Sequence, residues 1–310
     1  MGNFNSANNV ASGEKLSLVD STTNNVSTTK HGFAPKGDGD TSKFLNANGN
    51  YSVPSGLSSA TTTTLGSSLL PKRIILSNNA TDANNDIDFA AGNVILSDGS
   101  LAVALSSLMT KRLDAAWAAG TNQGGLDTGS KANSTTYSCF LIYDATTPSV
   151  DVIFTLGSNS APSYPSGYTK SAYLGRILTD GSGNIRSFTQ LSNKFFMRTM
   201  EVANVAPLNT NRFSLAATIP TGSVLEWFGS IYHSYSGSSG AVQSIFSSLA
   251  NADIEPTSTN LDNEASAGST YTNVWNDSII TNTSAQIGLR FNSTSARYYV
   301  TTRGWIDHNI

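Results

Sequence analysis

The sequence predicts a mainly β fold, in which an extended N-terminal segment precedes a jelly-roll-like β sandwich with one helical insertion. Three observations lead to this prediction. From Pro71 to the end of the chain, short β-prone runs alternate with turn residues. One stretch, Leu101 to Gly120, instead has its large apolar residues at nearly helical spacing. The first 56 residues contain too few apolar side chains to build a core alone.

The N-terminal part divides at two composition changes. Residues 1–56 have few aliphatic runs, so we expect them to stay extended unless another chain supplies apolar surface, either by docking or as a threefold bundle. Residues 57–70 are rich in Ser and Thr and form a linker. Residues 71–310 form the β-sandwich domain, and a subdivision near 188–194 is the alternative. We expect the apolar ending Thr301–Asp307 to close the sheet that begins at Arg73.

Strands and turns in this domain follow from β-prone runs and Asp-Gly pairs. Asp98-Gly99 and Asp180-Gly181 are hairpin signals because Gly readily adopts a positive φ. The helix predicted over Leu101 to Gly120 has Gly120 as its C-terminal cap. The expected strands cover residues 73–76, 84–89, 93–96, 137–143, 150–155, 213–219, 224–232, 287–291 and 296–302.

Charge is scarce in this chain and excludes some functions. Only 13% of residues are charged, against about 25% in average soluble domains, and Ser, Thr, Asn and Gly replace them. A formal net charge of -3 gives no basic field for a nucleic-acid backbone, so we expect no nucleic-acid partner. No apolar run is long enough to span a membrane and no signal peptide is visible, so we expect synthesis in a cytoplasm and no membrane insertion. The single cysteine, Cys139, is expected to be a buried, inert core residue.

Two stretches carry a family resemblance. The first runs from Asn24 to Lys36 as NNVSTTKHGFAPK and continues as DTSKFL at 40–45 and NGNY at 48–51. It resembles a repeat near the start of bacteriophage tail fibre and tail structural proteins. The second comprises NDIDFAAG at 85–92, LMTKRLDAAWAAG at 108–120, GGLDTG at 124–129 and LTDGSGNIR at 178–186. It is similar to a domain that recurs in phage and prophage virion proteins.

The resemblance implies a virion structural protein, first of all a trimeric tail fibre or receptor-binding subunit. Residues 1–56 would then be the particle-attachment and trimerisation segment. The implied partners are two further copies of the chain, other tail or baseplate proteins, and a glycan or protein on the host surface, and the implied location is the tail or surface of the virion. A head, collar or tail decoration protein without receptor binding is the alternative. The family pattern carries no catalytic residue onto this chain.

The residue types that support catalysis or metal binding are too scattered to define a site. His31, His233 and His308 have no ligand or triad spacing. Asp82, Asn84, Asp86 and Asp88 alternate as calcium ligands do, but the glycine and closing glutamate of an EF-hand are missing, which leaves a looser calcium site or a polar turn. The carboxylates of the 253–264 loop are interpreted as solvated loop charge. We therefore expect no enzyme activity, no catalytic residue, no metal and no cofactor.

One segment near the middle of the domain is a candidate binding site. A Ser-Gly-rich loop at 234–240 is flanked by aromatic residues. The simpler interpretation is a long hairpin whose aromatic side chains lie in the core. In the alternative, exposed aromatic rings with small polar neighbours recognise a host glycan or protein, and Tyr235, Trp227 and Tyr232 are the first candidates.

Overall fold

The computed structural model describes residues 43–45, 50–52, 72–157, 160–235, 241–266 and 274–310. The chain forms two compact units, Met1–Leu70 and Pro71–Ile310. Within the first unit, β1 (Phe44–Leu45) pairs with the antiparallel strand β2 (Tyr51–Ser52). The rest of the predicted 1–56 segment and 57–70 linker lies outside the described residues.

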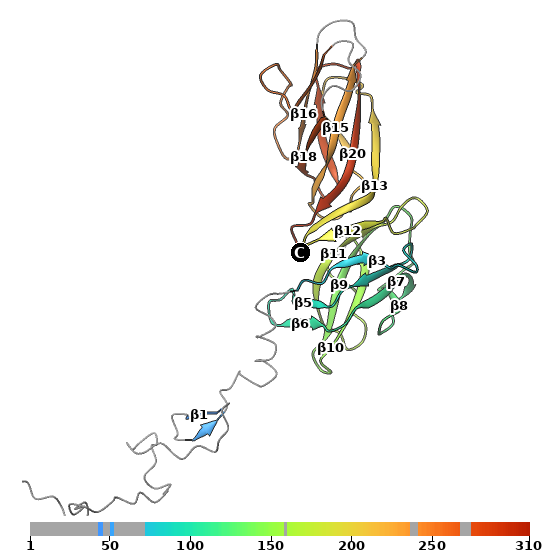
Figure 1. The fold of residues 1–310 in the computed structure, drawn as a ribbon, viewed down its shortest axis with the longest axis vertical. Coiled ribbons are helices and arrows are strands. Elements are labelled where there is room, and N and C mark those ends of the chain that lie inside the picture. The colour runs from blue at the N-terminus through green and yellow to red at the C-terminus, as the bar shows by residue number, and fades with distance from the viewer. Residues whose placement is uncertain (1–42, 46–49, 53–71, 158–159, 236–240, 267–273) are drawn as a thin grey trace, which may run out of the picture. The chain divides into compact units, whose positions relative to one another are not determined.

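Every regular element described in the second unit is a strand (Figure 1). The mainly β prediction is therefore confirmed, and most of the expected strands are present with ends shifted by a few residues. The strands are β3 (Leu76–Asn78), β4 (Asp86–Phe89), β5 (Gly92–Ile95), β6 (Ala102–Leu105), β7 (Met109–Ala116), β8 (Gln123–Leu126), β9 (Thr136–Asp144), β10 (Ser149–Leu156), β11 (Lys170–Leu178), β12 (Phe188–Leu191), β13 (Lys194–Val205), β14 (Phe213–Ala216), β15 (Glu226–Tyr235), β16 (Ala241–Ser247), β17 (Asn263–Ser266), β18 (Val274–Ile280), β19 (Gln286–Phe291) and β20 (Ala296–Ile306).

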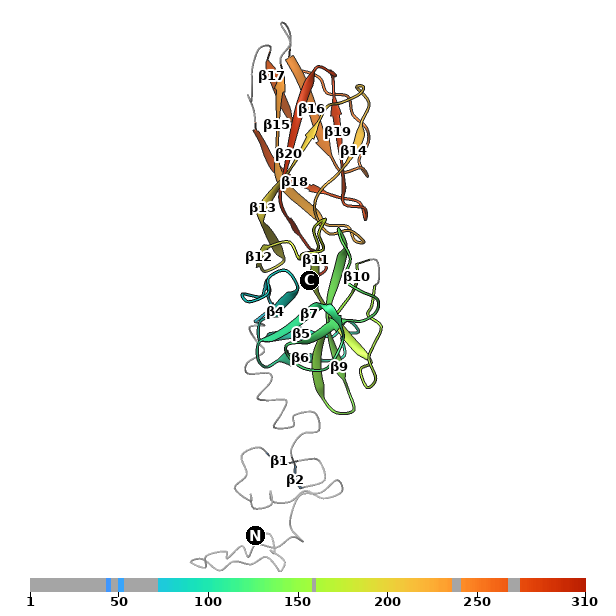
Figure 2. The same ribbon diagram turned by 90° about the vertical axis from the view of Figure 1, so that its right-hand side faces the viewer.

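One long sheet runs through the second unit. Its twelve strands follow the order β11-β9-β10-β8-β7-β4-β3-β12-β13-β20-β15-β18. A four-stranded sheet, β14-β19-β16-β17, and the β5-β6 hairpin complete the fold. Strands β3 to β11 form one half of the unit and β13 to β20 the other (Figures 1 and 2). The β12–β13 hairpin joins the halves, because β12 pairs with β3 and β13 pairs with β20. This hairpin occupies the 188–194 region.

The first half is organised around β9, which is buried on both faces. Its alternate residues Tyr137, Cys139 and Leu141 belong to the main core, whereas Phe140 and Ile142 pack with Ile153 in a second cluster. A nearly continuous apolar run is what a strand covered on both sides requires. The burial expected for Cys139 is confirmed, and this burial raises the pKa of the thiol above its usual range.

The second half is a β sandwich, as predicted. The inner faces of β15 and β20 pack against the four-stranded sheet, and the Tyr298 ring stacks on Phe291 at a centroid distance of 3.4 Å. Trp305 stacks on Phe195 of the neighbouring strand at 4.9 Å. A glycine is required at Gly304, because a Cβ there would lie 1.9 Å from the Phe195 carbonyl oxygen. Stacked aromatic rings therefore pack in the sandwich core together with aliphatic residues such as Ile231, Val242 and Ile287.

The helix predicted over Leu101 to Gly120 is wrong. This stretch forms β6 and β7, and along β6 the buried residues Val103 and Leu105 alternate with exposed alanines. Leu101 and Leu108, which the helix would have placed on its apolar face, are 44% and 56% exposed. The near-helical spacing arose because the leucines belong to two strands and a connecting turn. The Asp98-Gly99 signal was correct, since Gly99 has a φ of 70° in the turn between β5 and β6.

An ion pair lies inside the first half, between Lys111 of β7 and Asp151 of β10. The two side chains are 0% and 2% exposed, and Lys111 Nζ lies 2.7 Å from Asp151 Oδ1. The ammonium also donates to the carbonyl oxygens of Ala118 and Gly120, at 2.6 and 3.0 Å. Asp151 Oδ2 accepts from the backbone N–H of Gly120 at 2.7 Å. Burial lowers the pKa of Lys111, and the hydrogen bond to Asp151 opposes that shift.

Candidate binding surface on the outer sheet face

The sheet face that points away from the sandwich core carries the predicted binding residues. Along β15, Trp227 and Ile231 point into the core, so Phe228 and Tyr232 lie on the opposite face. The strand register places Phe228 beside Gly304 and Tyr232 beside Tyr299. We call this the outer face, and its large side chains are Phe196, Val202, Phe228, Tyr232, Ile280 and Tyr299.

Aromatic pairs cover much of the outer face. Tyr232 and Tyr299 stack with ring centroids 4.9 Å apart and planes 11° from parallel. Phe196 and Phe228 meet edge to face at 5.4 Å, and the Lys194 ammonium lies 4.1 Å from the Phe228 ring centroid. Pairs of this kind contribute about 0.5–1.5 kcal/mol each beyond their buried area. The rings are therefore held in place on the sheet before any partner binds.

Several outer-face side chains are unusually open to solvent for apolar groups. Phe196 is 38% exposed, Val202 54% and Ile280 43%. These positions were not expected from the sequence. Lys194–Val205 and Arg297–Trp305 carry large apolar residues in both alternating phases, so period-two patterning does not separate a core face from an open one there.

The three predicted contact residues have different environments. Trp227 is fully buried, and its Nε1 donates to Thr302 Oγ1 at 3.0 Å, so it is a core residue and cannot touch a partner. Its inclusion as a binding residue was wrong, because the strand's alternation turns it inward. Tyr232 is partly buried on the outer face, and Tyr235 is partly buried against the main core. The loop at 236–240 lies outside the described residues.

A shallow pocket of about 280 Å³ opens on the same face, at the ends of β13, β15, β18 and β20. Lys194, Glu226, Phe228 and Arg303 are among its lining residues. Burial alone would raise the pKa of Glu226, but hydrogen bonds from Ser278 and His308 hold it below its usual value. Arg303 is exposed and makes no hydrogen bond or ion pair within the described ranges. The pocket therefore offers an aromatic ring beside charges of both signs.

Of the carboxylates expected to be solvated loop charge, Asp253 and Glu255 are 43% and 70% exposed, and the four also contact protein partners. Arg290 pairs with Asp253 at 3.0 Å and more loosely with Glu255 at 3.8 Å. Asp262 Oδ2 accepts from the Phe246 backbone N–H at 2.6 Å, and Glu264 accepts from a glutamine side chain on β16. These contacts fix the loop against the four-stranded sheet.

The alternating acidic residues near β4 also bond locally. Both carboxylate oxygens of Asp82 accept from Asn85 Nδ2, and Asp88 Oδ1 accepts from Thr110 Oγ1 at 2.6 Å. In the part of the chain that the structure describes, no three His, Cys, Asp or Glu side chains group as metal ligands would. His31 lies outside the described residues, and His308 pairs with Glu226 at 2.7 Å. Nor is any described helix long and apolar enough to cross a membrane.

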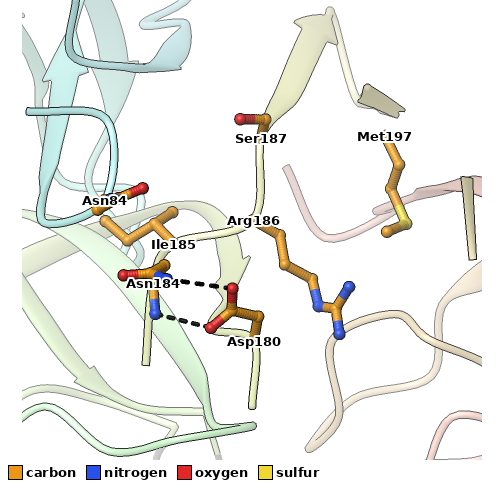
Figure 3. Close-up of a pocket in the computed structure, with 7 residues that line it drawn as sticks. All are labelled: Asn84, Asp180, Asn184, Ile185, Arg186, Ser187 and Met197. Carbon is orange, nitrogen blue, oxygen red and sulfur yellow. Dashed lines mark hydrogen bonds between the residues drawn. The ribbon is translucent and has the colours of Figure 1, made fainter. Parts of the chain in front are cut away.

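A second pocket, of about 270 Å³, lies beside the Asp180 turn, and its lining includes Arg186 and Met197 (Figure 3). Asp180 Oδ1 accepts from the backbone N–H groups of Ser182 and Asn184, at 2.8 and 2.9 Å. Burial would raise the pKa of Asp180, but these hydrogen bonds hold it below its usual value. The carboxylate therefore stabilises its own turn.

Comparison with known proteins gives no family for this chain. No protein-family model and no curated protein matches it. Among solved structures, one match is the structure of infectious bursal disease virus Gx strain, at 10% identity and a TM-score of 0.16. The match covers 75% of this chain and 64% of the viral one. A likeness this small supports no inference about shared fold or function.

Proposed function

We propose that the protein is a structural component of a bacteriophage virion, and specifically a trimeric tail fibre or receptor-binding subunit. The observation that carries the proposal is the outer face, where aromatic and aliphatic side chains stay exposed on a chain with few charges. The resemblance of residues 24–51 to tail fibre proteins gives the particle and the location. Exposed apolar patches on soluble proteins commonly mark interaction sites.

The chemistry of the outer face fits a glycan or protein on the host surface. Stacked tyrosines and the Phe196–Phe228 pair present rigid rings, and neighbouring hydroxyl groups supply hydrogen bonds. In this proposal, binding rests on stacking and hydrogen bonding by these rings rather than on ionic steering, and so varies little with salt. Three copies on one fibre raise the effective affinity of a weak single site.

Residues 1–56 attach the fibre to tail or baseplate proteins and associate as a trimer in this proposal. The Pro71–Ile310 unit has its own extensive core and does not need the segment for folding. We also propose that the chain has no catalytic activity, which accords with the protein partners of the 253–264 carboxylates.

The test combines location with adsorption. Antibody labelling of intact particles in electron microscopy should place the protein at the distal tail, and a position on the capsid lattice would favour a decoration protein instead. Val202→Glu introduces a charge on the outer face and should reduce phage adsorption, whereas the matched control Leu191→Glu changes an exposed residue of β12 and should not. Loss of the trimer in Val202→Glu would make the outer face a subunit interface.

A further inference from the structure

The end of the chain returns to β11 (Figures 1 and 2). A pocket of about 320 Å³ is lined by residues of both segments. Its walls come from both halves of the second unit. This volume is within the usual range of small-molecule sites, which often form between substructures. The lining residues are Ser97, Phe140, Ser160, Tyr173, Arg176, Gly222, Ser223 and Asn309.

The guanidinium of Arg176 is the chemically distinctive group in this pocket. Arg176 is only 7% exposed, and no carboxylate of the described residues lies within ion-pair distance. Nε donates to the Tyr173 hydroxyl at 3.1 Å, and Nη1 donates to the Thr221 carbonyl oxygen at 2.6 Å. Nη2 has no acceptor among the described residues. Three of the five N–H donors of this nearly buried cation, two on Nη2 and one on Nη1, therefore remain for a ligand.

The groups around Arg176 define what the ligand carries. Asp307 is fully buried and accepts a hydrogen bond from the Tyr173 hydroxyl. Because Arg176 donates to the same hydroxyl, Tyr173 links the guanidinium to this carboxylate. A guanidinium edge can bind a carboxylate or a phosphate through two hydrogen bonds. Repulsion from Asp307 grows with the charge of the ligand, so it disfavours a dianion such as phosphate more than a single carboxylate.

The remaining walls suit a hydroxylated ring. Phe140 and Tyr173 meet edge to face at 5.5 Å and give an apolar wall. Ser97, Ser223 and Asn309 give hydroxyl and amide groups that both donate and accept hydrogen bonds. Such a combination of an aromatic wall with small polar groups binds a sugar ring better than a purely aliphatic acid.

We infer that this pocket binds a monosaccharide that bears one carboxylate, with the carboxylate on Arg176. The inference is independent of the proposed tail role, because the pocket is separate from the outer face and its binding can be measured without a particle. The full-length protein is titrated with D-glucuronate in ligand-observed NMR, with D-glucose as the matched neutral ring. Glucuronate should bind at least about tenfold more tightly than glucose.

Two variants and one control locate the binding. Arg176→Gln should weaken glucuronate binding by about tenfold or more. Because this change also removes two structural hydrogen bonds, Ser223→Trp provides a second route by filling the pocket and leaving Arg176 in place. Arg303→Gln makes the same charge change on the outer face and should leave binding unaltered. Equal binding of the two sugars, no glucuronate binding, or full binding by folded Ser223→Trp would overturn the inference.

Discussion

Removing the ammonium of Lys111 should be one of the most damaging single changes in this chain. Lys111→Met keeps an unbranched side chain of similar length, so little cavity forms. The change leaves Asp151, which is 2% exposed, without its cation. It also leaves the Ala118 and Gly120 carbonyl oxygens without the ammonium donor. The effect thus reports the electrostatics of the buried pair rather than packing.

The expected loss follows from the burial of both partners. Breaking a buried ion pair by removing one partner costs about 3–5 kcal/mol. Asp151 keeps hydrogen bonds from the Gly120 and Val152 backbone N–H groups, at 2.7 and 2.6 Å, which partly stabilise the orphaned charge. We therefore expect the lower part of that range. Stability of a domain is only about 5–15 kcal/mol, so the variant should be visibly impaired but folded.

Urea unfolding near neutral pH, followed by tryptophan fluorescence, measures the change. The double variant Lys111→Met/Asp151→Asn should recover part of the loss, because the asparagine oxygen still accepts from Gly120 while the uncompensated charge is gone. A single-variant loss under about 1 kcal/mol, or a double variant no more stable than the single, would refute the reasoning.

Three further outcomes are expected. Trp227→Ala should lower the free energy of unfolding by about 3–5 kcal/mol in urea denaturation because the ring is fully buried. Tyr235→Ala should lower it by only about 1 kcal/mol. Equal losses of unfolding free energy in the two variants would contradict the assigned burial. Burial and neighbouring aspartates raise the pKa of Asp86. The stability of the protein should therefore fall as the pH rises through that pKa, because the ionised carboxylate is disfavoured in the folded state. Asp86→Asn should stabilise the protein near neutral pH but not in acid. Deleting residues 1–70 should leave a chain that melts cooperatively in calorimetry and is monomeric in light scattering; loss of the transition would mean that the sandwich depends on the deleted segment.

Sequence patterns predicted strands well where one unbroken run of apolar and aromatic residues has the length of a strand. The Tyr137–Tyr143 run predicted β9 because an unbroken apolar and aromatic run of strand length suits a doubly covered strand. The same logic failed for residues 101–120, where apolar spacing was counted across a turn. Strand order could not be predicted at all, because pairs such as β12 with β3 join residues more than a hundred positions apart.

The candidate site was predicted only in outline. β15 carries large apolar residues on both faces, so its composition does not say which face is inward. Trp227 and Ile231 lie on one face of β15, whereas Phe228 and Tyr232 lie on the other. Only the packing of the four-stranded sheet decides which of these two faces is buried. The Arg176 pocket was missed for a related reason, since Arg176 and Asn309 are brought together by long-range pairing.

The few charged residues of this chain do not all lie at the surface. Lys111, Arg176 and Asp307 are almost fully buried, so part of an already small set of ionic groups fixes the interior instead of solvating the surface. The 13% share of charged residues therefore overstates how ionic the surface is. Salt should then have little effect on glucuronate binding, because the guanidinium of Arg176 is shielded by burial. A steep loss of glucuronate binding with salt would instead place the contact on exposed charges such as Arg303.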